Sequence, residues 1–453
     1  MQFKNHNIYE VAIIGGGISG TALLYTLSNY TNINRIALIE KNPEVALGNS
    51  HKTSNSQTLH FGDIETNYTL EKAQKVKRAA NLVKNYILRN DPHQEIYSKY
   101  HKMVLGIGKE QTKELQIRYK EFKSLFPKLK LIKKEEIARL EPNVVKNRSL
   151  EEEIIALFTE EGYTIDFQRL AQSFLKRSIN SNQKNIDLMM ETKVKSITKE
   201  GELYKIQTDK EVIVAKTVAI TAAAYSLLFA KSLGYGHNYA LLNIAGNFYL
   251  APGVLNGKVY TVQLKKIPFA AIHGDSEVHD PSTTRFGPTA KVTLLLEQRQ
   301  YATIFEYFQT AGLSVNAILS FFNILSEQVI LRYIVKNLIY DIPLIGKRLF
   351  LKEVQKIVPS IQVSDLQLAK GYGGIRPQIV NLKTKRLEMG EAKIIGENIV
   401  FNITPSPGAS TCLQNAEYDT EKIISFLGQG YRFDKDQFLQ DLGEEQALTT
   451  RNA

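Results

Sequence analysis

The chain has 453 residues, of which 43% are hydrophobic and 23% are charged, and a formal net charge of +11. This length predicts two or three folding units, and this composition excludes a largely disordered chain. The positive charge fits nucleic-acid binding, attraction to an anionic membrane surface, or solubility alone. Because the lysines are scattered and no nucleic-acid module accompanies them, we favour solubility, with membrane attraction second, and expect no nucleic-acid partner.

The number of cysteines and the length of the apolar runs narrow the possible classes of protein further. Cys412 is the only cysteine, which excludes an intramolecular disulfide and a multi-cysteine metal site, so no metal is expected. The first ten residues lack the apolar core of a secretory signal, and no run of about eighteen apolar residues occurs. We expect a cytoplasmic protein without a membrane-spanning helix.

The start of the chain carries a nucleotide-binding pattern. Residues 11–20 read VAIIGGGISG, and the next predicted strand ends at Glu40. A strand, a Gly-x-Gly-x-x-Gly turn, a helix and a second strand ending in an acid together cradle a dinucleotide. Gly15 would permit the tight turn, Gly17 the approach of a pyrophosphate, and Gly20 the packing of helix on strand. Glu40 would accept hydrogen bonds from the adenosine ribose, but the motif does not say which dinucleotide is bound.

Periodicity and turn residues predict the rest of the chain. In chain order, the expected elements are a polar loop at 48–63, a helix at 70–88, a strand at 103–107, helices at about 109–126 and 165–179, a hairpin of 191–197 and 204–208, a strand at 211–221, strands at 247–250, 258–262 and 269–273, a mostly helical stretch at 301–357, a strand at 398–403 and a helix at 413–426.

The nucleotide-binding pieces are separated along the chain, which predicts a discontinuous domain with another domain inserted into it. The expected fold is mixed α/β (α+β): a two-domain flavoprotein with a split Rossmann-like FAD domain and an inserted substrate domain of mixed β-sheet and helices. The predicted FAD domain takes 1–95, 160–240 and 365–435, and the substrate domain takes 96–159 and 241–364, with a helical insert at about 301–357.

This discontinuous pattern favours FAD over a nicotinamide cofactor, because a flavoprotein buries the whole FAD and recruits later segments to it. Val194 is placed to cover the adenine, and the small residues after the strand at 211–221 fit beside the pyrophosphate. The segment TPSPGAST at 404–411 follows a strand and precedes a helix. Its N–H groups and the helix dipole would stabilise negative charge on a reduced flavin, the alternative being an N-cap without a ligand.

The polar loop offers further contacts. Ser54, Asn55 and Thr58 could hydrogen-bond a cofactor, and the alternative is a solvated loop that bonds to its own backbone. The full set of predicted cofactor-binding residues is Gly15, Gly17, Ile18, Ser19, Gly20, Glu40, Lys41, Ser54, Asn55, Thr58, Val194, Ala223, Gly374, Pro407, Gly408, Ala409 and Ser410.

Four residues are candidates for the chemistry. The segment PFAAIHGD places His273 and Asp275 just beyond an apolar strand. A histidine suits the removal of an alcohol proton, and Asp275 could orient it or stabilise the imidazolium. Arg376 sits between glycines and a proline, a rigid setting for a bidentate clamp on a carboxylate. His60 could reach the reaction centre from the polar loop. A purely structural role is the alternative for the histidines.

Eight segments of the chain resemble the FAD-dependent malate:quinone oxidoreductases, particularly their shorter, ε-proteobacterial-type form. They are AIIGGGISG, NSQTLHFGDIETNYT, NIAGNFY, GKVYTVQ, PFAAIHGD, FGPTA, GYGGIRPQ and NITPSPGAST, and together they span nearly the whole chain. PFAAIH, GPTA and GGIRPQ are also similar to segments of the L-2-hydroxyglutarate dehydrogenase and D-amino-acid oxidase group, whose members are two-domain flavoenzymes with a split FAD domain.

The resemblance implies oxidation of (S)-malate to oxaloacetate by hydride transfer to FAD, with electrons passed to membrane quinone. It implies that His273 takes the hydroxyl proton and that Arg376 clamps a substrate carboxylate. It also implies peripheral attachment to the cytoplasmic membrane, which the helical insert could supply through apolar residues interspersed with Arg332, Lys336, Lys347 and Arg348. A buried helical hairpin is the alternative for that insert. Two other functions stay open: a related FAD-dependent 2-hydroxyacid dehydrogenase or oxidase, and a non-catalytic FAD-binding protein.

Overall fold

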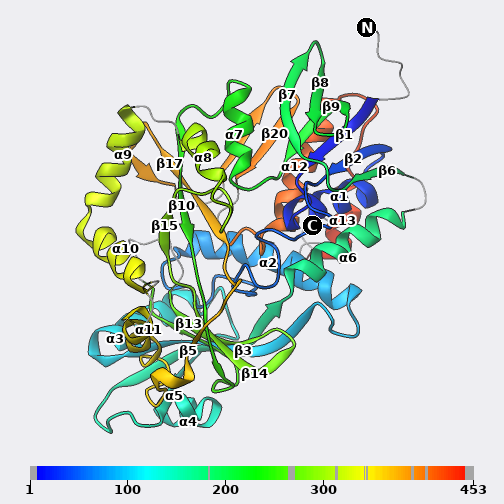
Figure 1. The fold of residues 1–453 in the computed structure, drawn as a ribbon. Helices are drawn as coiled ribbons and strands as arrows, with labels where there is room; N and C mark the ends of the chain where they lie inside the picture. The colour runs from blue at the N-terminus through cyan, green and yellow to red at the C-terminus, as the bar shows by residue number, and fades with distance from the viewer. Residues whose placement is uncertain are drawn as a thin grey trace.

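The structure is a computed structural model that describes residues 8–181, 184–263, 271–311, 315–340, 342, 345–388, 392–403 and 407–443. Within these residues the strands form three sheets (Figure 1), one of eight strands near the N-terminus, a second of eight strands, and one of four. The predicted mixed α/β fold is confirmed. The predicted domain boundaries stay a prediction.

The first sheet carries the glycine-rich motif. Its strands are β1 (Ile8–Ile14), β2 (Arg35–Ile39), β6 (Asn185–Met189), β7 (Val194–Glu200), β8 (Leu203–Thr208), β9 (Val212–Ile220), β19 (Ala392–Gly396) and β20 (Ile399–Ile403). β1 lies parallel between β2 and β9, and β6 and β20 continue the parallel order on either side. The predicted hairpin is present as β7 and β8, which extend β9. The second half of β1, residues 11–14, is an apolar run because a central parallel strand is buried on both faces.

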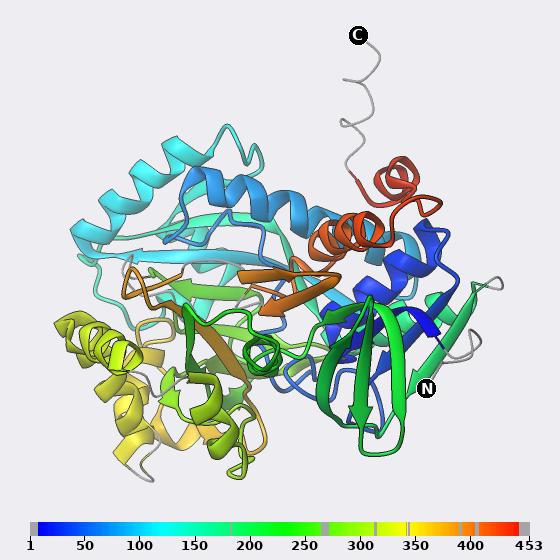
Figure 2. The ribbon, with the colours of Figure 1, turned by 90° about the horizontal axis from the view of Figure 1, so that it is seen from above.

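Helices cover one side of this sheet, and the ribbon of β7, β8 and β9 projects on the other (Figure 2). The helices are α1 (Ile18–Tyr30), α2 (Leu70–Asn90), α6 (Phe167–Ile179), α12 (Cys412–Leu427) and α13 (Lys435–Leu442), and α7 (Tyr225–Ser232) follows β9. α1 is buried almost all round because it packs against both α6 and α12. Tyr25 of α1 stacks on Phe174 of α6, with ring centroids 5.4 Å apart. Asp166 caps α6, which is why that helix begins two residues after its predicted start.

The second sheet joins segments that are far apart in sequence. Its strands are β3 (Tyr97–Ile107), β4 (Lys130–Lys133), β5 (Ile154–Ile165), β11 (Tyr249–Pro252), β12 (Lys258–Thr261), β13 (His273–Glu277), β14 (Asp280–Gly287) and β16 (Gln367–Leu368). The order is β16-β11-β14-β13-β12-β3-β5-β4, with β12 parallel to β3 and the other pairs antiparallel. The helices α3 (Gly108–Phe122), α4 (Lys134–Leu140) and α5 (Pro142–Val145) lie in the connections between β3 and β5.

The third sheet is β15-β10-β17-β18, and four helices follow β15 in the chain. The strands are β10 (Tyr239–Ala245), β15 (Lys291–Thr293), β17 (Ile375–Asn381) and β18 (Arg386–Leu387), and the helices are α8 (Thr303–Ala311), α9 (Val315–Ser326), α10 (Gln328–Tyr340) and α11 (Ile345–Val354), with the short helix η2 at Val363–Asp365. Ile324 of α9 and Ile330 and Ile334 of α10 share one apolar core with Leu242 and Ile244 of β10. Figures 1 and 2 show α9 and α10 at the outer edge of the molecule, away from β7 and β8.

Gly20 should be intolerant of a side chain, because a Cβ there would collide with the Gly15 carbonyl oxygen and lie 2.7 Å from Thr221 Oγ1. Gly20→Ala should lower the free energy of unfolding by about 1–3 kcal/mol, the usual cost of overpacking. Chemical denaturation followed by circular dichroism measures it. Gly48→Ala is the control, because its Cβ would meet nothing within 4 Å. Equal stability of the two variants would contradict the proposed packing.

Candidate active site

Contacts within the protein itself require glycine at the first and third positions of the glycine turn. Gly15 has φ +107°, and a Cβ there would approach Thr221 O to 2.7 Å, so both Gly15 and Gly20 are required for β1 and α1 to pack against the end of β9. A Cβ at Gly17 would meet only Ser50 Oγ, at 3.4 Å. The turn is therefore open at Gly17, where a phosphate could approach the start of α1.

The neighbours of this turn lie where a dinucleotide would need them. Glu40 is buried, and its Oε2 accepts a hydrogen bond from Gly16 N at 2.6 Å while Oε1 accepts one from Asn42 N at 2.9 Å. Thr192 N donates to Glu40 O at 2.9 Å, which brings the start of β7, with Val194, beside the acid. A carboxylate has about four acceptor positions, and Asn42 Nδ2 also donates to Oε1 at 2.7 Å, so about one position is left for a ribose hydroxyl.

Among the other predicted cofactor-binding residues at this end of the sheet, Ile18 and Lys41 already have partners within the protein. Ile18 N already donates to Ser50 Oγ at 3.0 Å, and Ser19 is half-buried in the first turn of α1. Lys41 forms an ion pair with Glu297 and lies over the Tyr225 ring. Ala223 has φ +51° in the turn after β9.

The polar loop and the turn before α12 contact each other. His60 N donates to Ser410 Oγ at 3.0 Å, and Ser410 Oγ donates to Thr58 O at 3.4 Å. His60 Nδ1 lies 2.7 Å from Glu65 Oε1. Burial raises the pKa of Glu65, but the His60 hydrogen bond and the Lys102 charge outweigh it and lower that pKa to about 2. The turn of Pro407, Gly408 and Ala409 is thus fixed beside His60, while 404–406 lie outside the described residues.

The predicted loop contact of Asn55 is explained by the loop itself. Asn55 Nδ2 donates to His51 O at 2.9 Å and Asn55 Oδ1 accepts from Gln57 N at 2.9 Å, which is the self-bonded alternative. Gly374 packs against the loop, because a Cβ there would lie 2.5 Å from Ser54 O.

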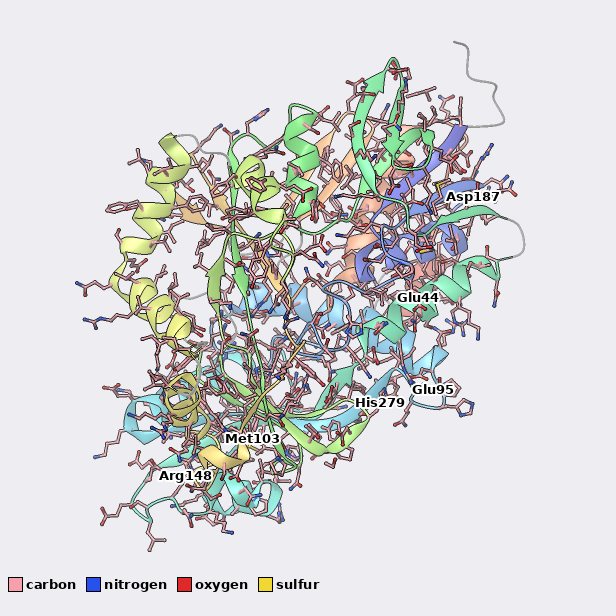
Figure 3. All side chains as sticks on the ribbon, in the orientation of Figure 1. Glu44, Glu95, Met103, Arg148, Asp187 and His279 are labelled. Atoms are coloured by element: carbon pink, nitrogen blue, oxygen red, sulfur yellow. The ribbon has the colours of Figure 1, made fainter. Side chains whose placement is uncertain are left out.

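Four charged side chains, the buried charged row, cross one face of the second sheet beneath this loop. Strand register aligns Arg285 (β14), Asp275 (β13), Lys258 (β12) and Lys102 (β3), and each is 0% exposed. Asp275 Oδ2 accepts from Lys258 Nζ at 2.8 Å and from Arg285 Nη2 at 2.9 Å. Residues on the opposite face, such as Met103, belong to an apolar core (Figure 3).

The buried charged row holds the polar loop. Lys258 Nζ also donates to Thr58 Oγ1 at 2.9 Å, and Lys102 Nζ donates to Asp63 Oδ1 at 2.7 Å. Neither lysine nor Arg285 was among the residues predicted from the sequence. The available signal was a cation at an inward position of a strand whose neighbours are apolar, which requires a partner when buried.

His273 lies next to the buried charged row on the same face. It pairs in register with Gly287 and Tyr260, and its ring stacks on Tyr260 with centroids 4.6 Å apart. Its Nδ1 lies 3.1 Å from Ala271 O, and its buried Nε2 has no partner among the described residues. Burial lowers the pKa of His273 to about 4, despite the opposing charge of Asp275. The ring is therefore neutral near pH 7, with an unused nitrogen.

Two expectations about this segment need correction. His273 and Asp275 do not follow a strand: they lie within β13, which begins at His273, while 269 and 270 lie outside the described residues. The alternating cross-strand contacts with β12 and β14 explain the strand. Asp275 makes no direct hydrogen bond to His273, so the histidine is oriented by the Ala271 carbonyl and the Tyr260 ring. The alternative role of Asp275, stabilising the imidazolium, stays a prediction. Burial raises the pKa of Asp275, but Arg285 and Lys258 outweigh it and lower that pKa to about 2.

Arg376 lies on β17 of the third sheet and reaches toward the same region. Its Nη2 donates to Thr289 O at 3.3 Å, and Thr289 follows two residues after Gly287, the register partner of His273. Burial lowers the pKa of Arg376, which remains a cation. Within the described part of the chain, no carboxylate forms an ion pair with it. His273 and Arg376 thus lie on two different sheets that are linked by residues 287–289, since Gly287 pairs with His273 and Thr289 accepts from Arg376.

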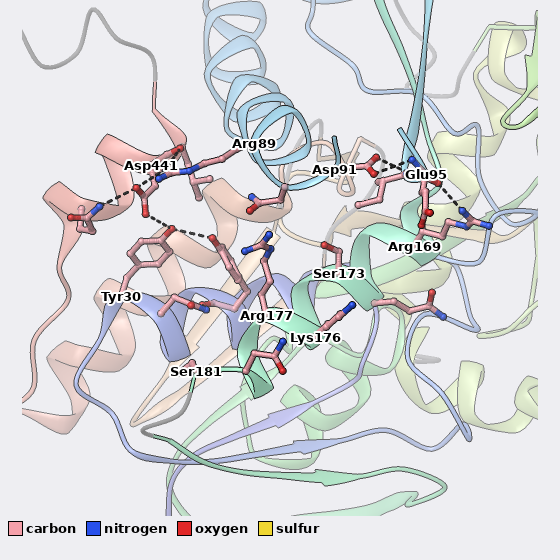
Figure 4. Close-up of a pocket in the computed structure, with 18 residues that line it drawn as sticks. Tyr30, Arg89, Asp91, Glu95, Arg169, Ser173, Lys176, Arg177, Ser181 and Asp441 are labelled. Atoms are coloured by element: carbon pink, nitrogen blue, oxygen red, sulfur yellow. Dashed lines mark hydrogen bonds and ion pairs between the residues drawn. The ribbon is translucent and has the colours of Figure 1, made fainter. Parts of the chain in front are cut away.

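The cavity shown in Figure 4 lies elsewhere. It has a volume of about 1030 Å³ between α1, α2, α6 and α13, and none of the predicted site residues lines it. Among its charged groups, Arg89 pairs with Asp441 at 2.6 Å, and Arg169 donates to the Glu95 carbonyl at 3.1 Å. The cavity does not contact the candidate catalytic residues.

The fold is that of a two-domain FAD-dependent oxidoreductase. The structure is similar to that of L-α-glycerophosphate oxidase from Mycoplasma pneumoniae with FAD bound, with a TM-score of 0.63 and 16% identity, over 94% of this chain and 96% of that one. The family model described as malate:quinone oxidoreductase (Mqo) matches residues 7–417, and the chain belongs to this family.

Two curated relatives agree with this assignment. Malate:quinone oxidoreductase of Helicobacter pylori is 39% identical over 446 residues, which cover 97% of this chain and 98% of that protein. Mitochondrial L-2-hydroxyglutarate dehydrogenase of Bos taurus is 25% identical over 429 residues, which cover 89% of this chain and 86% of that protein. Both resemblances noted in the sequence are confirmed.

Lys102→Met should leave Asp63 buried without its cation and lower the free energy of unfolding by about 3 kcal/mol at pH 7. Burial already raises the pKa of Asp63. The folded form of the variant will hold the Asp63 proton still more tightly than the unfolded chain, so its stability should fall further as pH rises from 5 to 8.

Denaturant unfolding at several pH values measures this. Lys130→Met is the control, because Lys130 pairs with Glu160 at the surface, where such pairs contribute about 0–1 kcal/mol. A loss in Lys102→Met no larger than in the control would contradict the buried pair.

Proposed function

We propose that the protein oxidises (S)-malate to oxaloacetate, with hydride passing to FAD and electrons passing on to membrane quinone. Two observations support this proposal: His273 Nε2 is buried without a partner among the described residues, and Arg376, which pairs with no described carboxylate, donates to Thr289 O, two residues beyond the register partner of His273. A 2-hydroxy acid offers each of these groups what it lacks: a hydroxyl proton for the imidazole and a carboxylate for the guanidinium.

The residues present fit FAD. Gly15, Gly17 and the start of α1 would hold the pyrophosphate, Glu40 the ribose, and the turn at 407–410 the pyrimidine edge of the flavin. When bound, FAD supplies the acceptor for hydride from the substrate α-carbon. Arg376 binds and orients the substrate through a carboxylate. His273 accepts the hydroxyl proton at Nε2, and the Ala271 carbonyl keeps the other ring nitrogen protonated.

Charge near the site supports a substrate with a negative charge. The buried charged row carries three cations against one acid, and Arg376 adds a fourth cation. Asp63 and Glu65 add two acids; burial raises the pKa of Asp63, whereas the pKa of Glu65 is about 2. A substrate carboxylate would balance the remaining positive charge.

Anaerobic mixing of the purified holoprotein with a panel of 2-hydroxy acids tests the function. Malate should bleach the flavin absorbance, and a soluble quinone analogue should restore it. Bleaching by 2-hydroxyglutarate but not by malate would show that the protein has the activity of the related dehydrogenases instead. No bleaching by any acid would leave a non-catalytic FAD-binding protein.

His273→Gln should slow flavin reduction by malate about 10²- to 10⁴-fold while leaving the FAD absorbance spectrum intact, because only the base is lost. In the parent protein the rate should be nearly constant from pH 6 to 8 and fall toward pH 4, because the low pKa of His273 keeps it neutral until then. Stopped-flow absorbance measures both. An unchanged rate in the variant would remove His273 from the chemistry.

We further propose that α9 and α10 attach the protein to the cytoplasmic face of an anionic membrane. Their outward residues are apolar, including Ile318, Phe322 and Val335, and Phe322 is 72% exposed. Arg332 is exposed between them. In the described residues no single helix is long and apolar enough to span a membrane; Ala317–Ser326 and Ile330–Tyr340 meet that standard only together, with a bend of 86°. A bent apolar pair flanked by cations suits the bilayer interface.

Phe322→Glu should lower the fraction bound to vesicles containing phosphatidylglycerol about tenfold, the effect of losing one buried aromatic residue. Co-sedimentation measures the bound fraction. Leu150→Glu is the control, because Leu150 is 95% exposed but lies between α5 and β5. Equal losses in both variants, or equal binding to neutral vesicles, would contradict this surface.

A further inference from the structure

Lys258 is the central cation of the buried charged row. Its ammonium donates to Asp275 Oδ2 at 2.8 Å and to Thr58 Oγ1 at 2.9 Å. Arg285 donates to the same Asp275 oxygen at 2.9 Å, so Asp275 would keep a cationic partner without Lys258. Burying an ammonium is costly, and pairing with Asp275 alone does not explain why a second cation is held there.

Lys258 also supports the surroundings of His273 from two directions. Tyr260, two residues along β12, is the register partner of His273 and stacks on its ring. The Thr58 hydroxyl that accepts from Lys258 lies 3.0 Å from Tyr260 Oη. The Lys258 ammonium therefore contacts Asp275, the nearest negative charge to His273. It also contacts Thr58, the hydrogen-bond partner of the Tyr260 ring that covers His273.

We propose that Lys258 is a positioning residue of the reaction, which fixes Asp275 and Thr58 beside His273 and thereby controls when that histidine takes up a proton. Lys258 has this role only if His273 is the base of the proposed function. In that step the O–H bond of the substrate breaks, its proton goes to His273 Nε2, and the hydride of the adjacent C–H bond goes to FAD.

The groups that face His273 explain in which direction Lys258 changes the proton affinity of that histidine. They are Asp275 on β13, Lys258 and Tyr260 on β12, and Arg285 on β14, with Lys102 on β3 and Asp63 and Glu65 on the polar loop farther along the row. Asp275 favours the imidazolium, whereas Lys258 and Arg285 oppose it. With Lys258 neutral, the charge of Asp275 is less balanced and His273 binds a proton more tightly. A histidine that is already protonated cannot accept the substrate proton.

Three substitutions in the holoenzyme separate charge from shape. Lys258→Met removes the charge and the hydrogen bonds, Lys258→Gln keeps a hydrogen-bonding side chain without the charge, and Lys258→Arg keeps the charge. The first readout is the titration midpoint of His273 by NMR with labelled histidine, the signal being assigned by its loss in His273→Gln. The second is the acid limb of the pH–rate profile for flavin reduction by malate.

Both neutral variants should raise the His273 midpoint by roughly one pH unit or more, a tenfold gain in proton affinity, and should move the acid limb by the same amount. Lys258→Arg should leave both near the parent values. Lys130→Met removes a surface lysine from β4 of the same sheet and should move neither.

An unmoved midpoint in a folded Lys258→Met or Lys258→Gln protein would overturn the role of Lys258, and so would a midpoint that moves equally in Lys258→Arg. If neither neutral variant folds, a shifted midpoint in Lys258→Arg decides against the proposal and an unshifted one supports it. The NMR readout does not need turnover. A parent protein that malate fails to reduce would therefore count against the proposed function and leave the Lys258 result standing.

Discussion

The attachment of the polar loop to the second sheet by buried cations is the constraint on which the rest of the site depends. The loop leaves the first sheet after β2, and three strands of the second sheet hold it: Arg285 donates to the Ser56 carbonyl at 3.3 Å, Lys258 binds Thr58, and Lys102 binds Asp63. Arg118 of α3 adds bonds to backbone carbonyls farther along, including Tyr68 O at 3.1 Å. Each cation is buried, so each bond is needed to offset lost hydration.

This attachment places two different kinds of residue together. The loop brings His60 and Thr58 from the nucleotide-binding side, while β12 and β13 bring Tyr260 and His273 from the other side. Ser410, before α12, closes the arrangement through its bonds to the loop at His60 and Thr58. Because ion pairs and hydrogen bonds are directional, they fix the relative position of these segments more sharply than apolar contact would.

The sequence predicted the parts of this site that follow local rules. The glycine turn, Glu40 and the hairpin of β7 and β8 depend on backbone geometry within a few residues, and the structure contains them. The α2 and α12 helices likewise begin within a residue of expectation. His273 was placed beyond a strand because its strand character comes from pairing with β12 and β14, which no local pattern records.

The cations of the buried charged row were missed for the same reason. Lys258 and Lys102 read as surface residues in a chain with 57 lysines and arginines. Their burial follows only from strand register, since residues 102, 258, 275 and 285 meet after the sheet has formed. Residue type and local setting predicted His273 and Arg376 as candidates, and the family resemblance implied their roles. The groups that support His273 came from the three-dimensional arrangement alone.

The discontinuity of the first sheet has a consequence for how the protein is made. β1 pairs with β9, about 200 residues later, and β9 pairs with β20, about 180 residues after that. During synthesis from the N-terminus, the glycine turn emerges first but its sheet cannot close until β20 has left the ribosome. Until then the apolar faces of β1 and β9 lack their final partners. A cell making this protein therefore has to protect a nearly full-length, unfinished chain before it can take up its cofactor.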